Sequence, residues 1–63
     1  MRLEIKVLKV LRDRSASVLE IAEETMVTPK QIQKVLDRLE EIGILIGMSY
    51  NGEKVYVRAH SIT

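Results

Sequence analysis

The stretch TMVTPKQIQKVLDRLEEIGIL, residues 25–45, contains a helix start, an apolar stripe and a helix stop. Thr28 can cap the first backbone amides, Pro29 suits the first helical position because its missing N–H needs no partner there, and Gln31 can complete the cap. The buried stripe would consist of apolar residues at helical spacing: Ile32, Val35, Leu36, Leu39 and Ile42. Gly43 supplies a left-handed residue that ends the helix. We therefore predict a helix from Pro29 to just before Gly43, with one buried face and one polar face.

A second helix is predicted directly before this stretch. Ser17 and Glu20 have the spacing of a capping box, in which a hydroxyl and a carboxylate three residues later cap each other's backbone amides. The helix would run to about residue 24 or 25. Four residues would face inward, with Ile21 on the edge of that face: Val18, Leu19, Ala22 and Thr25. The connection from Thr25 to Val27 is so short that the two helices suit a helix-turn-helix.

A first helix is predicted from about Arg2 to Asp13. Its core face would consist of residues at helical spacing: Leu3, Val7, Val10 and Leu11. Met1, Ile5 and Leu8 form a second apolar stripe on the flank of that face. This stripe could be a subunit contact, which predicts a homodimer with the first helix at the interface. It could instead cover a neighbouring loop, the sheet or the chain's own segment Ala59–Thr63, which predicts a monomer.

A β-hairpin is predicted after Gly43, because the apolar period changes there from 3.6 to 2. Asn51-Gly52 favours a two-residue type I′ turn, which requires positive φ at both residues. This turn sets the strand pairing: Tyr50 with Glu53, Ser49 with Lys54, Met48 with Val55, Gly47 with Tyr56, Ile46 with Val57, Leu45 with Arg58 and Ile44 with Ala59. The face expected to pack on the helices carries Ile44, Ile46, Met48, Val55 and Val57, and Lys54 and Arg58 would lie on the outward face. The polar break Ser15–Ser17 could add one brief strand.

Length and composition indicate one small domain, residues 1–63, with a single core. The chain is 46% hydrophobic and 30% charged, which is typical of a globular protein. It has no Cys for a disulfide or a thiolate zinc site, and a cytoplasmic location fits that composition. No apolar run approaches 18 residues, so we expect no membrane association. The start at Met1 favours a complete small protein over a fragment of a larger regulator or polymerase-associated protein.

Residue sets for catalysis or metal binding are missing from the sequence. An active site needs a nucleophile, a base or paired carboxylates that converge in a pocket. The single His, His60, lies near the C-terminus and is interpreted as a surface residue. Glu20, Glu23 and Glu24 are interpreted as the solvated face and end of the second helix. We therefore expect no enzyme activity, no metal and no cofactor.

Three helices followed by a hairpin is the order of a winged helix, an α+β fold that is mainly α. The stretch SVLEIAEETMVTPKQIQKVLDRLEEIGIL, residues 17–45, resembles the core of bacterial and archaeal winged helix-turn-helix regulators such as the MarR-like and ArsR-like groups. The matching features are the capped SVLEIAEE helix, the following helix with its Gly stop, and the Asn-Gly wing tip. The resemblance covers Leu3 to Ala59.

One departure from this family lies in the turn before the third helix. Many such sequences have Gly there, because one residue of the turn has positive φ, whereas this chain reads Thr25-Met26-Val27. A non-Gly residue in that conformation costs about 1 kcal/mol. Either the turn differs slightly, or Met26 packs well enough to offset the strain.

The resemblance implies that the third helix enters the major groove of duplex DNA and that the wing touches the backbone or the minor groove. Carried over by position, the DNA-contacting candidates on the third helix are Thr28, Lys30, Gln31, Gln33, Lys34, Asp37 and Arg38. The candidates on the wing are Asn51, Gly52, Lys54 and Arg58. Gln can bridge N6 and N7 of adenine, and Lys can meet guanine acceptors or phosphate. The acidic residues in the second half of the helix suggest that only its first two turns approach DNA.

Two functions remain open at this point. The first is a small DNA-binding protein that regulates transcription, with duplex DNA and a second copy of the chain as partners. The alternative is a winged-helix protein-interaction module, in which the third-helix face or the Met1/Ile5/Leu8 stripe docks on a protein partner. The net charge of only +1 keeps this alternative open, because a strong sequence-independent nucleic-acid binder usually has a basic excess. A helix face of mixed charge can also be merely solvated.

Overall fold

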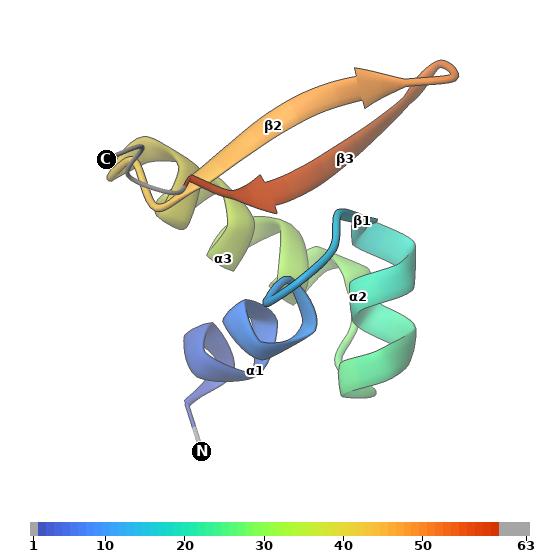
Figure 1. Cartoon of the computed structure of the whole chain (residues 1–63). Coiled ribbons are helices and arrows are strands. Elements are labelled where there is room, and N and C mark those ends of the chain that lie inside the picture. Colours follow the sequence, from blue (N-terminus) through green and yellow to red (C-terminus); the bar gives the residue numbers. More distant parts are fainter. Residues whose placement is uncertain (1, 60–63) are drawn as a thin grey trace.

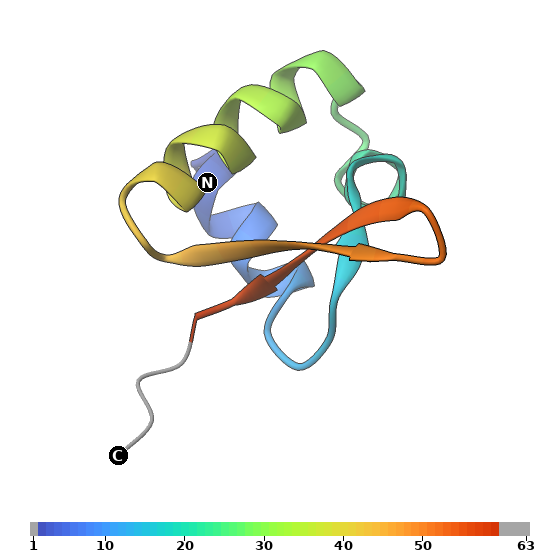
Figure 2. The ribbon, with the colours of Figure 1, turned by 90° about the horizontal axis from the view of Figure 1, so that it is seen from above.

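The computed structural model describes residues 2–59, and its elements follow the predicted order (Figure 1). In chain order they are α1 (Leu3–Val10), β1 (Ala16–Ser17), α2 (Val18–Thr25), α3 (Pro29–Glu41), β2 (Leu45–Tyr50) and β3 (Glu53–Arg58). The strands form one antiparallel sheet in the order β1-β3-β2, so the brief strand expected near Ser15–Ser17 is confirmed. Figures 1 and 2 show the hairpin of β2 and β3 starting beside the C-terminal end of α3 and diverging from that helix toward its tip. Met1, His60 and the end of the segment Ala59–Thr63 lie outside the described residues, together with the expectations placed on them.

One apolar cluster joins all three helices to the sheet. Its buried members are Val7, Leu11, Ala16, Ile21, Ala22, Ile32, Leu36, Leu39, Leu45 and Tyr56. The residues Leu3, Leu8, Val10, Val18, Val27 and Val35 pack around it and are partly buried. A core of this size is small, so each of its large side chains contributes a substantial share of the stability.

The helix starts are fixed by side-chain caps. Ser17 and Glu20 form the predicted capping box: the Glu20 backbone N–H donates to Ser17 Oγ at 3.2 Å, and the Ser17 backbone N–H donates to Glu20 Oε1 at 2.9 Å. The bond from the Ser17 backbone lowers the pKa of Glu20. At α3, Thr28 Oγ1 accepts from the Gln31 backbone N–H at 3.4 Å. The reciprocal part of that cap was wrong, because Gln31 Oε1 contacts the Thr28 hydroxyl instead of its backbone amide.

The end of α3 is a Schellman motif around Gly43. Gly43 has φ +85°, and its N–H donates to the carbonyl of Glu40 at 3.0 Å, while the N–H of Ile44 donates to the carbonyl of Leu39 at 2.9 Å. This pair of bonds is the standard way in which a left-handed glycine ends a helix. The motif fixes the direction in which the chain enters β2. Ile42, predicted to be buried, follows the last helical residue as the C-cap and is exposed.

The hairpin has the predicted register, but the face that packs on the helices is the opposite of the predicted one. Six of the seven predicted pairs, from Leu45–Arg58 to Tyr50–Glu53, are present in the strands, and at the seventh the N–H of Ala59 donates to the carbonyl of Ile44 at 2.9 Å. Asn51 and Gly52 have φ 52° and 78°, as a type I′ turn requires. The buried face, however, carries Leu45 and Tyr56, so the expectation that the Ile46/Met48 face packs on the helices was wrong. Ile46 and Met48 are each 48% exposed. Strand alternation leaves two faces, and the exit of the chain from α3 turns Leu45 inward.

The pairing of β1 agrees with this orientation. Ala16 lies opposite Tyr56 in the sheet, and both are buried on the side of the helices. Ser17 lies opposite Val55, which is buried although it belongs to the outer face of the hairpin. The short third strand therefore anchors β3 to the start of α2 and gives the hairpin the packing partner that an isolated hairpin lacks.

Two helices differ from their predicted details. In α2, the prediction that Leu19 faces inward was wrong, since Leu19 is 65% exposed, and Ile21, predicted on the edge of the inward face, is fully buried. At 100° per residue the two side chains flank the Val18–Ala22 side of the helix on opposite edges, and only the packing of α2 against its neighbours decides between them. In α1, the helix ends at Val10 instead of Asp13. The N–H of Arg12 donates to the Lys9 carbonyl, which closes a tighter last turn.

Candidate nucleic-acid interface

The exposed face of α3 begins at a capped N-terminus and carries its basic residues in the first half. Thr28 is exposed at the cap, and Lys30 and Lys34 lie one helical turn apart on the side opposite the buried stripe. Arg38 continues this exposed side. The amides at a helix N-terminus attract anions, and the two lysines add positive charge close to it. This half of α3 therefore favours contact with a phosphate backbone.

Gln33 was predicted to be exposed, but its position in the structure is more constrained. Its side chain is half-buried between α3 and the sheet, where Nε2 donates to the hydroxyl of Tyr56 at 3.0 Å and to Oδ1 of Asp37 at 2.7 Å. The contact with Tyr56 crosses from α3 to β3. Gln33 is therefore a link between the third helix and the wing. The sequence pattern gave no sign that Tyr56 belongs to the site, because its hydroxyl meets a residue far away in the chain.

Lys54 lies on the wing face that turns toward α3, so its predicted outward position was wrong. Its Nζ is 3.6 Å from Oε1 of Glu40 and 5.2 Å from the centre of the Tyr56 ring. Hydrogen bonding to the Tyr56 side chain, followed by charge interactions with Tyr56 and Glu40, raises the pKa of Lys54. The ammonium group is therefore fully charged at neutral pH. It offsets Glu40, one of the acidic residues in the second half of α3.

A glycine makes room for this bridge. A Cβ atom added at Gly47 would lie 2.6 Å from Cε of Lys54 and 2.9 Å from Oε2 of Glu40. The absence of a side chain at Gly47 lets Lys54 cross the hairpin toward α3. Neither Gly47 nor Glu40 was predicted to take part in the site, since no local pattern connects them. Arg58, the other basic candidate of the wing, shares this face with Lys54 and is half-buried opposite Leu45.

The wing tip and the helix-turn-helix connection are both exposed. Asn51 and Gly52 form the tip, away from the helices (Figure 1). In the connection, Met26 has φ 60° and ψ 35° and is 91% exposed. The turn position that is glycine in many proteins of this fold therefore has a left-handed conformation here too. Both expectations for this turn were therefore wrong. The turn keeps its left-handed residue, and Met26 is too exposed for its packing to offset the strain.

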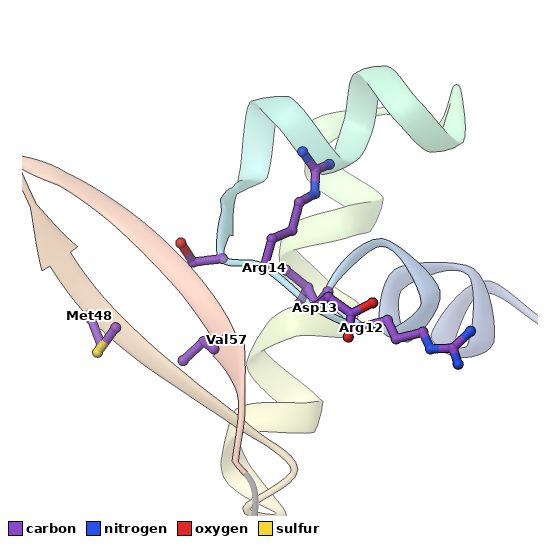
Figure 3. A pocket seen from close by; sticks show the side chains of 7 residues that line it. Arg12, Asp13, Arg14, Met48 and Val57 are labelled. Carbon is purple, nitrogen blue, oxygen red and sulfur yellow. The ribbon is translucent and has the colours of Figure 1, made fainter.

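A hollow on the outer side of the sheet does not resemble a ligand site. It has a volume of about 490 Å³ and lies between the loop after α1 and the outer face of the hairpin, where Met48 and Val57 line it. Figure 3 shows that Arg12 and Arg14 point in different directions, and Arg14 forms an ion pair with Glu24 of α2. Its polar groups therefore do not converge on a common point.

The described part of the chain offers neither a metal site nor a membrane span. Residues 2–59 contain no group of three or more His, Asp or Glu side chains placed to hold a metal ion. Within the same range, none of the helices is long and apolar enough to cross a membrane.

The fold is similar to that of a solved protein, ZitR. No family model matches the sequence, and no curated protein matches it. The structure superposes on a mutant form of ZitR from Lactococcus lactis with a TM-score of 0.82 and 16% sequence identity. The match covers 94% of this chain and 43% of the ZitR chain, so this chain spans less than half the length of that protein. The architecture is that of a winged helix.

Proposed function

We propose that this chain is a DNA-binding regulator that contacts duplex DNA through α3 and the wing. The observation that carries the proposal is the placement of Lys30 and Lys34 on the exposed first half of α3, in a winged-helix fold. The likeness of the fold to ZitR supports this class of protein. The protein would act without catalysis, in the cytoplasm, by occupying a DNA site and blocking or recruiting other proteins. Further contacts with the DNA phosphate backbone would come from Thr28, Gln31, Arg38, Asn51 and Gly52.

A titration with mixed-sequence duplex DNA tests this proposal. We expect the backbone amide NMR signals of residues 28–38 and of the wing tip to shift, and the affinity to fall steeply when the salt concentration rises. The amides of α1 serve as the internal control and should remain in place. Shifts in α1 or on the outer sheet face alone, with no salt-dependent binding, would contradict a DNA-binding role for α3.

The second candidate function is a protein contact, and the observation that favours it is the apolar outer face of the hairpin. Exposed apolar side chains gather at the end of α3 and along β2: Ile42, Ile44, Ile46, Met48 and Tyr50. In the described sheet β2 is an edge strand, whose outer backbone groups can pair with another strand. Contiguous exposed apolar surface of this kind marks interaction sites.

The occupant that fits this face is a second copy of the chain. The strand Leu45–Tyr50 carries no charged residue, so two copies can meet there without repulsion between like charges. An antiparallel pairing centred on Gly47 would bring Ile46 of each copy opposite Met48 of the other and keep both apolar sides on one face. The alternative dimer surface is the stripe on α1. There Ile5 is 45% exposed, while Leu8 packs against the core.

Two matched substitutions separate these dimer surfaces. We propose that the chain is a homodimer, and sedimentation at high micromolar concentration should show it. Met48→Glu should convert the dimer to a folded monomer if the outer sheet face is the interface, because a buried carboxylate without a partner is strongly unfavourable. Ile5→Glu should do so if the α1 stripe is the interface. An unmutated chain that sediments as a monomer would contradict both versions.

A further inference from the structure

Both N–H groups of the Gln33 side chain donate hydrogen bonds within the protein. Nε2 donates to Oδ1 of Asp37 and to the hydroxyl of Tyr56. A carboxylate accepts hydrogen bonds and does not donate them, so the amide nitrogen, and not the oxygen, must face Asp37. Within residues 2–59 no donor bonds to Oε1 of Gln33. The group that Gln33 can offer to a ligand is therefore an acceptor.

Tyr56 holds this arrangement in place from the core. Its side chain is fully buried, and its ring belongs to the same cluster as Leu36 and Leu39 of α3. Asp37 lies one helical turn beyond Gln33 and is exposed, so this contact would extend beyond the first two turns that the charge pattern predicted to approach DNA. The carboxylate keeps acceptor capacity after it receives the bond from Gln33. Gln33 and Asp37 thus form an acceptor pair, which is defined here as Oε1 of Gln33 together with the carboxylate of Asp37.

We propose that the acceptor pair selects a base with an amino group on its major-groove edge, cytosine or adenine, over guanine or thymine. This inference rests on the proposed DNA binding through α3. Cytosine presents the N4 amino group and adenine the N6 amino group, whereas guanine and thymine present the carbonyl oxygens O6 and O4. The carbonyl oxygen of guanine or thymine would face the two acceptor groups of Gln33 and Asp37, be repelled by them and receive no hydrogen bond. The pairing of Gln33 with Tyr56 also removes the free N–H that a two-bond contact with N6 and N7 of adenine would need.

A selection from randomised duplexes measures this preference. Duplex DNA with a randomised core is bound to the protein at low salt, and the retained fraction is sequenced. We expect one position per bound module where cytosine or adenine exceeds guanine or thymine by about tenfold or more. Asp37→Ala should abolish that preference. Glu41→Ala is the matched control, since it removes one exposed carboxylate from the same helix face and should leave the preference unchanged.

Tyr56→Phe tests the positioning role of the buried hydroxyl. The substitution keeps the ring and its packing and frees one N–H of Gln33. Gln33 could then bridge N6 and N7, so the preference should narrow from cytosine or adenine to adenine alone. A role in stability only would lower the melting temperature without changing which base is selected. Circular dichroism checks that both variants are folded.

The outcomes separate this inference from the proposed function. A wild-type protein that retains no duplex at low salt would overturn both. If the protein retains duplex DNA without a base preference, or with a preference for guanine or thymine, the proposed role of the acceptor pair is overturned and the proposed DNA binding stands. A preference that survives Asp37→Ala would also overturn it.

Discussion

Replacing Lys30 and Lys34 together by alanine should weaken duplex DNA binding and reduce its dependence on salt. Each phosphate contact contributes about 0.9 to the slope of log K against log salt, so two lost contacts change the slope by roughly 1.8. Over a fourfold rise in salt, the unmutated chain should therefore lose about tenfold more affinity than the double variant. Fluorescence anisotropy with a labelled duplex at several salt concentrations measures both slopes.

A variant of equal charge serves as the control. Lys6→Ala with Lys9→Ala also removes two exposed lysines, but from α1, outside the proposed interface. Its salt slope should remain close to that of the unmutated chain, because these lysines would make no contact with phosphate. Equally reduced slopes for both double variants would show that Lys30 and Lys34 act only through the net charge. An unchanged slope in the folded α3 variant would reject their contact with phosphate.

Leu45→Ala should strongly destabilise the fold, whereas Ile46→Ala should have a small effect. Leu45 is 2% exposed and belongs to the core cluster, so its truncation leaves a cavity and should cost about 2–5 kcal/mol. That is a large share of the stability of a domain this small. Ile46 lies on the outer face, so at a protein concentration too low for the proposed dimer to form, its truncation should cost less than about 1 kcal/mol.

Urea denaturation followed by circular dichroism gives the free energy of unfolding for each variant. The comparison is internally matched, since both substitutions shorten an aliphatic side chain to alanine in the same strand, one residue apart. Similar costs at the two positions would mean that the hairpin buries both faces, for instance in a dimer at the measured concentration. A larger cost at Ile46 would mean that the orientation of the hairpin is the reverse of the one described.

The features that depend on near neighbours in the chain could be predicted from the sequence. The Ser17–Glu20 capping box, the helix stop at Gly43 and the Asn51-Gly52 turn all follow from contacts within a few residues. The strand register followed from that turn as well, because a two-residue loop fixes which residues lie opposite each other. The order of the elements, and with it the winged-helix fold, was therefore determined locally.

The features that depend on distant contacts were decided only by the tertiary structure. Period-2 alternation defines two faces of a hairpin, and here both carry apolar residues, so the pattern could not show that Leu45 and Tyr56 would be the buried ones. The pairing of Ala16 with Tyr56, which lie far apart in the chain, made that choice. The same orientation placed Lys54 beside Glu40. It also brought the hydroxyl of Tyr56 to Gln33, a side chain that was predicted to be exposed and free.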